Sequence, residues 1–263
     1  MTDSPTRELE RPAPQRRRRW LKPLVWSVAG LVVLVGLFFA ADAILRQVGQ
    51  NLVRDQVQKE LPAGITAKKL TVTIDGFSVI GQYLTGSFDR VELSSPSVTV
   101  NGAPMAVRIT ATDIPTDFSQ PVGHVAGTLR IHQDALNALV QVPNTESTIL
   151  LGDETLGLKG TAKLIGIPVA YTASVTPSLA GGGIVDLTPG AVKVTALSTS
   201  VDLTSLASRI LGDKPLPICV AEYLPTGVEV TGIDVVKGAA TVHVAASDIV
   251  LDQKTFDSRG HCS

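Results

Sequence analysis

Residues 75–93 read DGFSVIGQYLTGSFDRVEL, an apolar stretch in which glycines recur at positions 76, 81 and 86. The stretch is too short and too polar to cross a bilayer, which takes about 20 apolar residues. Its acidic residues, Asp75, Asp89 and Glu92, are not grouped with any histidine. A role in folding or binding therefore fits this stretch better than catalysis, and the flanking sequence shows what fold it belongs to.

Apolar residues around this stretch recur at every second position, as in strands with one buried face. The alternating sets are Leu70, Val72 and Ile74; Met105, Val107, Ile109 and Ala111; Val192 and Val194; Val228 and Val230; Ile233 and Val235; and Val242 and Val244. Turn-forming residues separate them at Asn101-Gly102, Ile114-Pro115, Thr188-Pro189-Gly190 and Lys237-Gly238. The pattern predicts an antiparallel sheet.

Residues 42–61 have the period of an amphipathic helix. The apolar stripe consists of Leu45, Val48, Leu52, Val57 and Leu61. Pro62 and Gly64 end the helix. The default expectation is that this stripe packs into the protein's own core, and contact with a membrane surface is the second interpretation.

Two shorter segments, Gln133–Gln141 and Asp202–Leu211, also have helical spacing, and Gly181-Gly182-Gly183 predicts a loop. Neither a clear domain break nor an internal repeat follows the first helix. The combination predicts a single α+β domain.

The N-terminal residues indicate a membrane segment. Leu24–Ala41 contains no charged residue and measures about 27 Å as a helix, close to the thickness of the bilayer's hydrocarbon core. Arg16–Arg19 precede it, and the positive-inside rule places them in the cytoplasm. We expect a basic cytoplasmic segment at 1–22, a membrane segment at 23–43 and an extracytoplasmic domain at 44–263.

Two forms of this topology remain open. The apolar run is longer than a usual signal sequence, which favours an uncleaved single-pass anchor. Ala41-Asp42-Ala43 fits a signal cleavage site, which would release the domain after Ala43. In both forms the domain lies outside the cytoplasm.

Charge disfavours nucleic acid as a partner. The chain has 23 basic and 24 acidic residues, and residues 1–22 account for seven of the basic ones and three of the acidic ones. The remainder is acidic, whereas phosphate binding needs a basic face.

The only cysteines, Cys219 and Cys262, lie in the extracytoplasmic part of this topology. An oxidising compartment favours a disulfide between them, with two free thiols as the alternative. Their spacing supports neither redox catalysis nor a structural metal site.

The search for catalytic groups finds no positive case for an enzyme. His124, His132, His243 and His261 form no pair at ligand spacing, and no nucleophile elbow or phosphate loop occurs. The acidic groups Asp153-Glu154 and Asp113 with Asp117 match no calcium loop. We expect no catalytic residue, no metal and no cofactor.

The stretch at residues 75–93 resembles the signature of the LmeA-type phospholipid-binding proteins of the actinobacterial cell envelope. The matching positions are Gly76-Phe77, Gln82, Leu84, Gly86, Asp89 and Val91. The segment Leu224-Pro225-Thr226-Gly227-Val228 opens a region similar to the family's closing strand pair. The resemblance covers about residues 42–250.

This resemblance implies a tubular lipid-binding fold, in which an antiparallel sheet curls around a long helix and leaves an apolar cleft. It also implies phospholipid binding in lipoglycan maintenance, without a catalytic residue. The expected ligand is a phospholipid or lipid-linked glycan, and the expected lining is Leu45, Val48, Leu52, Val57, Phe77, Tyr83, Leu84 and Phe88.

Two other functions remain open. One is a membrane-anchored scaffold that stabilises an envelope glycosyltransferase, which predicts a filled core and an exposed apolar patch. The other is an envelope lipid hydrolase, which predicts a Ser or Asp beside His124, His132 or His243 in a cleft.

Overall fold

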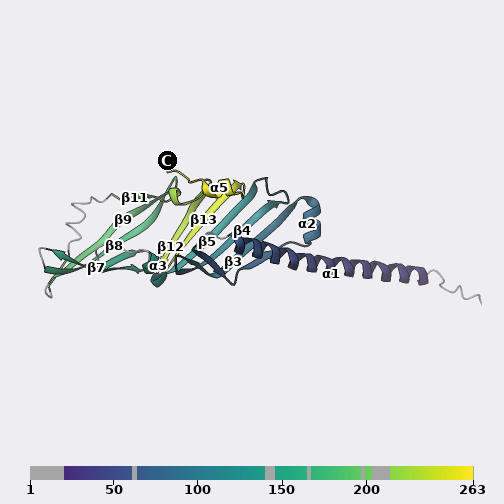
Figure 1. The fold of residues 1–263 in the computed structure, drawn as a ribbon, viewed down its shortest axis with the longest axis horizontal. Coiled ribbons are helices and arrows are strands. Elements are labelled where there is room, and N and C mark those ends of the chain that lie inside the picture. Colours follow the sequence, from purple (N-terminus) through teal and green to yellow (C-terminus); the bar gives the residue numbers. More distant parts are fainter. Residues whose placement is uncertain are drawn as a thin grey trace, which may run out of the picture. The chain divides into compact units, whose positions relative to one another are not determined.

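Antiparallel strands make up most of the structure, a computed structural model that describes residues 21–60, 64–139, 146–164, 167–196, 199–202 and 214–262 (Figure 1). The chain divides into two compact units, residues 1–44 and residues 45–263. The helices are α1 (Leu21–Glu60), α2 (Val79–Thr85), α3 (Gln133–Leu139) and α5 (Gln253–Asp257), with a 3-10 helix η1 (Ala221–Tyr223). The predicted α+β class with mainly antiparallel strands is confirmed.

A seven-stranded sheet, here called sheet A, has the order β1-β3-β4-β5-β13-β12, and β2 also pairs with β3. Its strands are β1 (Ile65–Lys68), β2 (Thr71–Ile74), β3 (Ser87–Val100), β4 (Ala103–Pro115), β5 (Val122–His132), β12 (Val228–Val236) and β13 (Ala239–Ile249). The predicted turn Asn101-Gly102 joins β3 to β4 with positive φ at both residues, as a two-residue hairpin requires. Lys237-Gly238 joins β12 to β13, and of these two residues Gly238 has a positive φ, of 79°.

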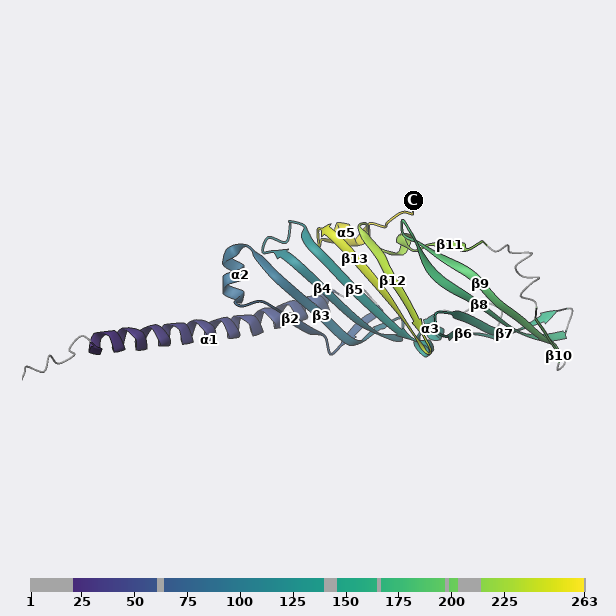
Figure 2. The same ribbon diagram turned by 180° about the vertical axis from the view of Figure 1, so that it is seen from behind.

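A six-stranded sheet, sheet B, has the order β10-β9-β8-β7-β6, and β11 also pairs with β9. Its strands are β6 (Glu146–Leu151), β7 (Leu156–Leu164), β8 (Ile167–Gly181), β9 (Ile184–Ala196), β10 (Thr199–Asp202) and β11 (Leu216–Cys219). Opposite views show the two sheets following one another along the second unit (Figure 2).

Two predicted turns lie within strands. Ile114-Pro115 forms the end of β4 and pairs with Phe88 and Ser87 of β3. Thr188-Pro189-Gly190 lies inside β9, where Pro189 pairs with Val175 across an irregularity in the ladder. Because the register shifts there, β9 accommodates both a proline and a glycine without ending.

β-bulges explain why the apolar alternation changes parity along two strands. In β12 the set Val228 and Val230 is even-numbered, whereas Ile233 and Val235 are odd-numbered. A register shift between Val230 and Gly232 keeps all four on one face. In β3 a second shift lies between Ser95 and Val98 and contains Pro96, a residue that sheets tolerate at bulges.

A small hydrophobic cluster joins the two sheets. Leu151 of β6 packs with Val235 of β12 and Ala240 of β13, and Leu136 of α3 lies against them. The side-chain amide of Asn137 exchanges two hydrogen bonds with the backbone of Ile149, at 2.6 and 2.9 Å. The helix predicted at Gln133–Gln141 is confirmed over Gln133–Leu139 as α3, which anchors sheet B to sheet A.

The predicted helix over residues 42–61 is confirmed as the second half of α1, which is continuous from the apolar segment. Its stripe is not buried, contrary to the default expectation, because Leu45, Val48 and Leu52 are 49, 47 and 65% exposed. Within the second unit this half meets the body at few points. Arg46 donates hydrogen bonds to the carbonyl oxygens of Ile74 and Gly76, both at 2.8 Å.

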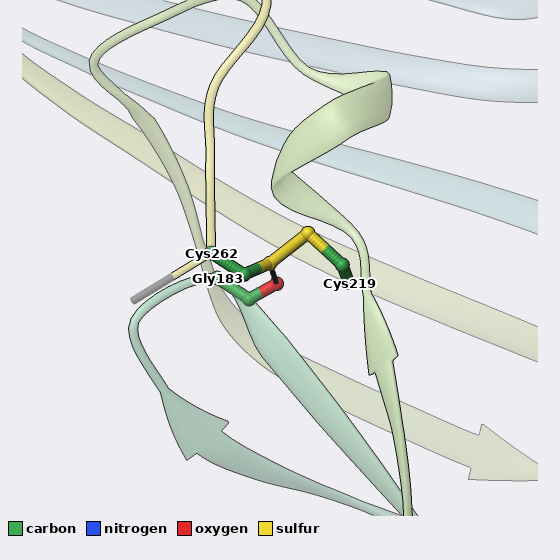
Figure 3. The surroundings of a disulfide bond; sticks show 3 residues. All are labelled: Gly183, Cys219 and Cys262. Atoms are coloured by element: carbon green, nitrogen blue, oxygen red, sulfur yellow. Dashed lines mark hydrogen bonds between the residues drawn. A yellow bond between two sulfur atoms is a disulfide. The ribbon is translucent and has the colours of Figure 1, made fainter.

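Cys219 and Cys262 form the expected disulfide, with Cα atoms 5.8 Å apart (Figure 3). The Sγ atom of Cys262 lies 3.1 Å from the carbonyl oxygen of Gly183, which also accepts a hydrogen bond from the amide of Val220. The bond ties the segment after α5 to β11 and to the hairpin between β8 and β9.

Several predicted features lie outside the described residues. They are the basic cluster Arg16–Arg19, the stripe residue Leu61, the helix-ending Pro62, residues 140–141 of the first short helix and residues 203–211 of the helix predicted at Asp202–Leu211. Asp202 itself is the last residue of β10.

Candidate functional site

The register of sheet A separates an apolar face from a polar face. One cross-strand row on the apolar face runs Leu93, Ile109, Gly127, Val244 and Val230, from β3 to β12. The neighbouring row on the other face runs Ser94, Arg108, Thr128, His243 and Gly232. In these two rows the aliphatic side chains all lie on one face, and the charged and hydroxyl side chains lie on the other.

Sheet B has the same two-faced construction. Its apolar face includes Ile149, Leu158, Ala173 and Val192, which are paired in sequence across β6, β7, β8 and β9. The opposite face places Thr148, Lys159, Thr172 and Lys193 in a row. Aliphatic faces thus occur in both sheets of the second unit.

These faces are not packed like an ordinary core. Among the described residues, Val122 is the largest side chain fully shielded from solvent. Leu93, Val107, Leu129 and Val242 are only half-buried, and Ile109 is 37% exposed. A close-packed interior would leave few such residues accessible, so the apolar faces form a surface that a ligand can cover.

Two apolar pockets lie side by side on the apolar face of sheet A. The first, of about 160 Å³, is lined by Val57 of α1 together with Leu70, Leu93, Val98 and Val107. The second, of about 130 Å³, includes Val125, Val228, Val244 and Ile249. Ile109 lines both pockets, and polar atoms contribute no accessible surface to either. This lining is suited to hydrocarbon.

The structure distributes the eight expected lining residues over three environments. Val57 lines the first apolar pocket. Phe88 packs against the buried cluster of Ala111, Ile114 and Val122. The other six, Leu45, Val48, Leu52, Phe77, Tyr83 and Leu84, are exposed. Sequence reasoning missed the lining strand residues, above all Ile109, because core and lining positions share one alternation.

The signature stretch forms α2 and the turns around it. Ser78 caps the N-terminus by accepting a hydrogen bond from the amide of Gly81 at 3.0 Å. Gly86 closes the C-terminus with φ of +90°, the left-handed conformation that glycine adopts without strain. The helix therefore has a signal at each end, although its seven residues are too few to show a helical period.

Gln82 fixes the orientation of α2. Its side chain is 7% exposed. Its Nε2 donates to the carbonyl oxygen of Asp75 at 3.0 Å, and its Oε1 accepts from the amide of Asp89 at 2.7 Å. Gly76, with φ of +106°, leaves room for this amide, since a Cβ there would collide with the Gln82 side chain. The signature positions thus serve one local arrangement.

The polar face of sheet A holds a hollow of about 610 Å³ that includes Arg108, Arg130, Thr128 and His243. The Nε2 atom of His243 lies 2.7 Å from Oδ2 of Asp234. This is the acidic neighbour that a hydrolase predicts. Ser94 on the same row is three strands from His243, roughly 14 Å at about 4.8 Å per strand. The pair therefore has no serine nucleophile within reach in this row.

Comparison with known proteins gives a family and no individual relative. Searches of curated proteins and of solved structures return no match. The family model described as LmeA-like phospholipid-binding matches residues 40–245, which include α2 with Gln82, the whole lining of the first apolar pocket and most of the lining of the second. The chain belongs to the LmeA-like phospholipid-binding family.

Proposed function

We propose that the protein is a non-enzymatic phospholipid-binding protein of the cell envelope, which shuttles, presents or senses lipid during lipoglycan maintenance. A phospholipid or a lipid-linked glycan would lay its acyl chains on the apolar faces of the sheets. The supporting observation is the aliphatic face of sheet A, along which the two apolar pockets extend from Val57 on α1 to Ile249 at the end of β13.

Hydrocarbon contact alone can supply the affinity. Removing a methylene from water contributes about 0.8 kcal/mol, so burying ten of them would contribute about 8 kcal/mol before the cost of ordering the chain. No catalytic group is needed for such binding. Leu45, Val48 and Leu52 would extend the aliphatic surface along α1 toward the apolar segment.

We further propose that α1 anchors the protein with residues 45–263 on the outer side of the cytoplasmic membrane. The described part of α1 contains one stretch long and apolar enough to cross a membrane. Its residues 31–41 are exposed throughout, as lipid-facing residues are. The test is whether the basic residues before α1 are protected from added protease in sealed cells.

Lipid binding is tested with a matched pair of substitutions on β4. Ile109→Lys places a charge between the two apolar pockets, whereas Thr110→Lys places it on the opposite face, beside Glu92. Each full-length protein is purified from a bacterial membrane, and its bound phospholipid per chain is measured by extraction and by native mass spectrometry. We expect Ile109→Lys to lose most of the bound lipid and Thr110→Lys to retain it.

Equal lipid content in the two variants would contradict binding on this face. A wild-type chain that carries no lipid, and takes none from phosphatidylcholine vesicles, would contradict the carrier function. In that case the glycosyltransferase scaffold would be the better function, since it needs an exposed apolar patch and no ligand.

A further inference from the structure

In helix α2 the polar and apolar side chains have exchanged the positions that they take in an ordinary surface helix. Its glutamine, Gln82, is turned inward, whereas Tyr83 and Leu84 are 66 and 79% exposed. Phe77, immediately before the N-cap, is 80% exposed. A soluble surface would place such residues inward and the glutamine outward. Because the hydrogen bonds of Gln82 fix the helix, the outward position of the apolar residues is built into the fold.

A neighbouring loop adds a fourth exposed apolar residue. The carbonyl oxygen of Gly86, at the end of α2, accepts a hydrogen bond from the amide of Thr116 at 2.9 Å. Two residues later Phe118 is 64% exposed. Its loop is folded on Asp117, whose carboxylate accepts from the amide and the hydroxyl of Ser119. We call Phe77, Tyr83, Leu84 and Phe118 the tip patch.

The chain itself limits how far the tip patch can lie from the membrane. The predicted membrane segment ends at Ala43, and Arg46 follows three residues later. Three residues span at most about 10 Å in any conformation. The guanidinium of Arg46 holds the carbonyl oxygens of Ile74 and Gly76, at 2.8 Å each, and Phe77 is the next residue. The start of the tip patch is therefore tied to the chain just beyond the bilayer core.

We propose that the tip patch inserts into the outer leaflet of the membrane that α1 crosses, and marks where lipid passes between the bilayer and the apolar face of sheet A. Phenylalanine and leucine suit the hydrocarbon boundary, and tyrosine suits the headgroup level. This inference rests on the proposed anchoring and lipid binding, and names the membrane surface as the partner of α2.

The nature of the contact follows from nearby charges. Asp75 and Asp117 lie within two residues of the tip patch in the sequence, and the cation beside it, Arg46, is hydrogen-bonded to the carbonyl oxygens of Ile74 and Gly76. Carboxylates gain nothing from anionic headgroups, so apolar insertion would drive the contact. We expect it in neutral phosphatidylcholine vesicles and at high salt, where an electrostatic contact would be screened.

The test places an environment-sensitive fluorophore on single introduced cysteines in the full chain, reconstituted into phosphatidylcholine vesicles. The native cysteines are joined in a disulfide and do not react with the label under non-reducing conditions. Labels replace Leu84 or Phe118, and a control label replaces Tyr223, an aromatic residue of η1 that is 78% exposed. Vesicles with nitroxide-bearing lipids then report which labels touch the bilayer.

We expect blue-shifted emission and strong quenching at positions 84 and 118, unchanged by high salt, and an unquenched, water-like label at position 223. Water-like labels at 84 and 118, or equal quenching at all three positions, would overturn the proposal. Bound lipid is measured on the same labelled variants before reconstitution, by extraction and native mass spectrometry. Bound phospholipid with unquenched labels would support the proposed lipid binding and reject insertion of the tip patch. Quenched labels on a chain without bound phospholipid would support insertion and reject the proposed lipid binding.

Discussion

At the scale of single residues, Gln82 shows most directly how one amino acid determines which side chains are exposed on the surface. A buried amide with three hydrogen bonds, to Asp75, Ser78 and Asp89, holds a seven-residue helix that has little stability of its own. The same bonds keep Tyr83 and Leu84 in solvent. One polar residue therefore determines where the apolar residues of the signature stretch point.

Replacing Gln82 with alanine should destabilise the protein. The substitution leaves the amide of Asp89 and the carbonyl of Asp75 without their partner, which we expect to cost about 1–3 kcal/mol. Denaturant unfolding measures the change. Gln58→Ala, at an exposed glutamine of α1, is the control and should change the free energy of unfolding by about 0.5 kcal/mol or less. Equal effects would contradict the role of Gln82.

The loop that carries Phe118 should respond to acid. Hydrogen bonds from the hydroxyl of Ser119, and then from its amide and from Gln120, lower the pKa of Asp117 below its ordinary value of 3.8. A lowered folded-state pKa means that the charged carboxylate stabilises the loop above pH 3.8, and that this is lost as pH falls through the lowered value. The amide resonance of Ser119 should shift in that range. In Asp117→Asn, which cannot titrate, the shift should be absent.

At the scale of elements, β11 shows why the disulfide matters. It is a four-residue strand that pairs with β9 through Leu187, Asp186, Val185 and Ile184, and Cys219 is its last residue. The disulfide closes a loop with a sequence separation of 43 that includes β12 and β13, both strands of sheet A. Covalent closure thus restricts the unfolded chain across parts of both sheets.

Breaking the disulfide should cost up to about 4 kcal/mol on the chain-entropy account. The double variant Cys219→Ser, Cys262→Ser should unfold at a lower urea concentration than the oxidised wild type. Dithiothreitol should lower the wild-type midpoint toward that of the variant and leave the variant itself unchanged. A midpoint that is the same with and without the bond would show that the loop gains no stability from closure.

How far sequence predicts each element depends on the strength of its local signal. The strands around Ile109 and Val242, the turn at Asn101-Gly102 and the helix over 42–61 follow from period and turn chemistry. Helix α2 could not be predicted in this way, because it is stabilised by the hydrogen bonds of one glutamine and has no apolar period in its sequence. The turn expected at Pro189 fails because a register shift absorbs it. The exposure of Leu52 could not be predicted either, since a helical apolar period does not show whether another part of the protein covers those side chains.

At the scale of the whole second unit, the aliphatic faces of sheets A and B raise the question of whether one ligand uses both. The cluster of Leu151, Val235 and Ala240 joins the sheets, with Leu156 and Ile233 against it. Backbone hydrogen bonds also cross the junction, from Glu154 to Val235 and from Gly238 to Leu151. A long acyl chain could therefore extend from one apolar face to the other.

A charge on sheet B tests this directly. Val175 pairs with Leu156 and Pro189 on the apolar face, and Thr176 is the next residue on the opposite face. If both sheets hold lipid, Val175→Lys should reduce bound phospholipid several-fold and Thr176→Lys should not. Retention of lipid by both variants would confine binding to sheet A, where Ile109→Lys provides the comparison.

The bulges in β3 and β12 determine where this protein can change length. Deleting one residue from a regular strand turns every later side chain over, which would send valines outward and threonines inward. Deleting Thr231 would instead restore a plain alternation of Val228, Val230, Ile233 and Val235 on one face, and the same holds at Pro96. Single-residue insertions and deletions among relatives should therefore gather at such bulges, which in sheet A lie at these two places, because a change of length there does not turn the later side chains onto the other face.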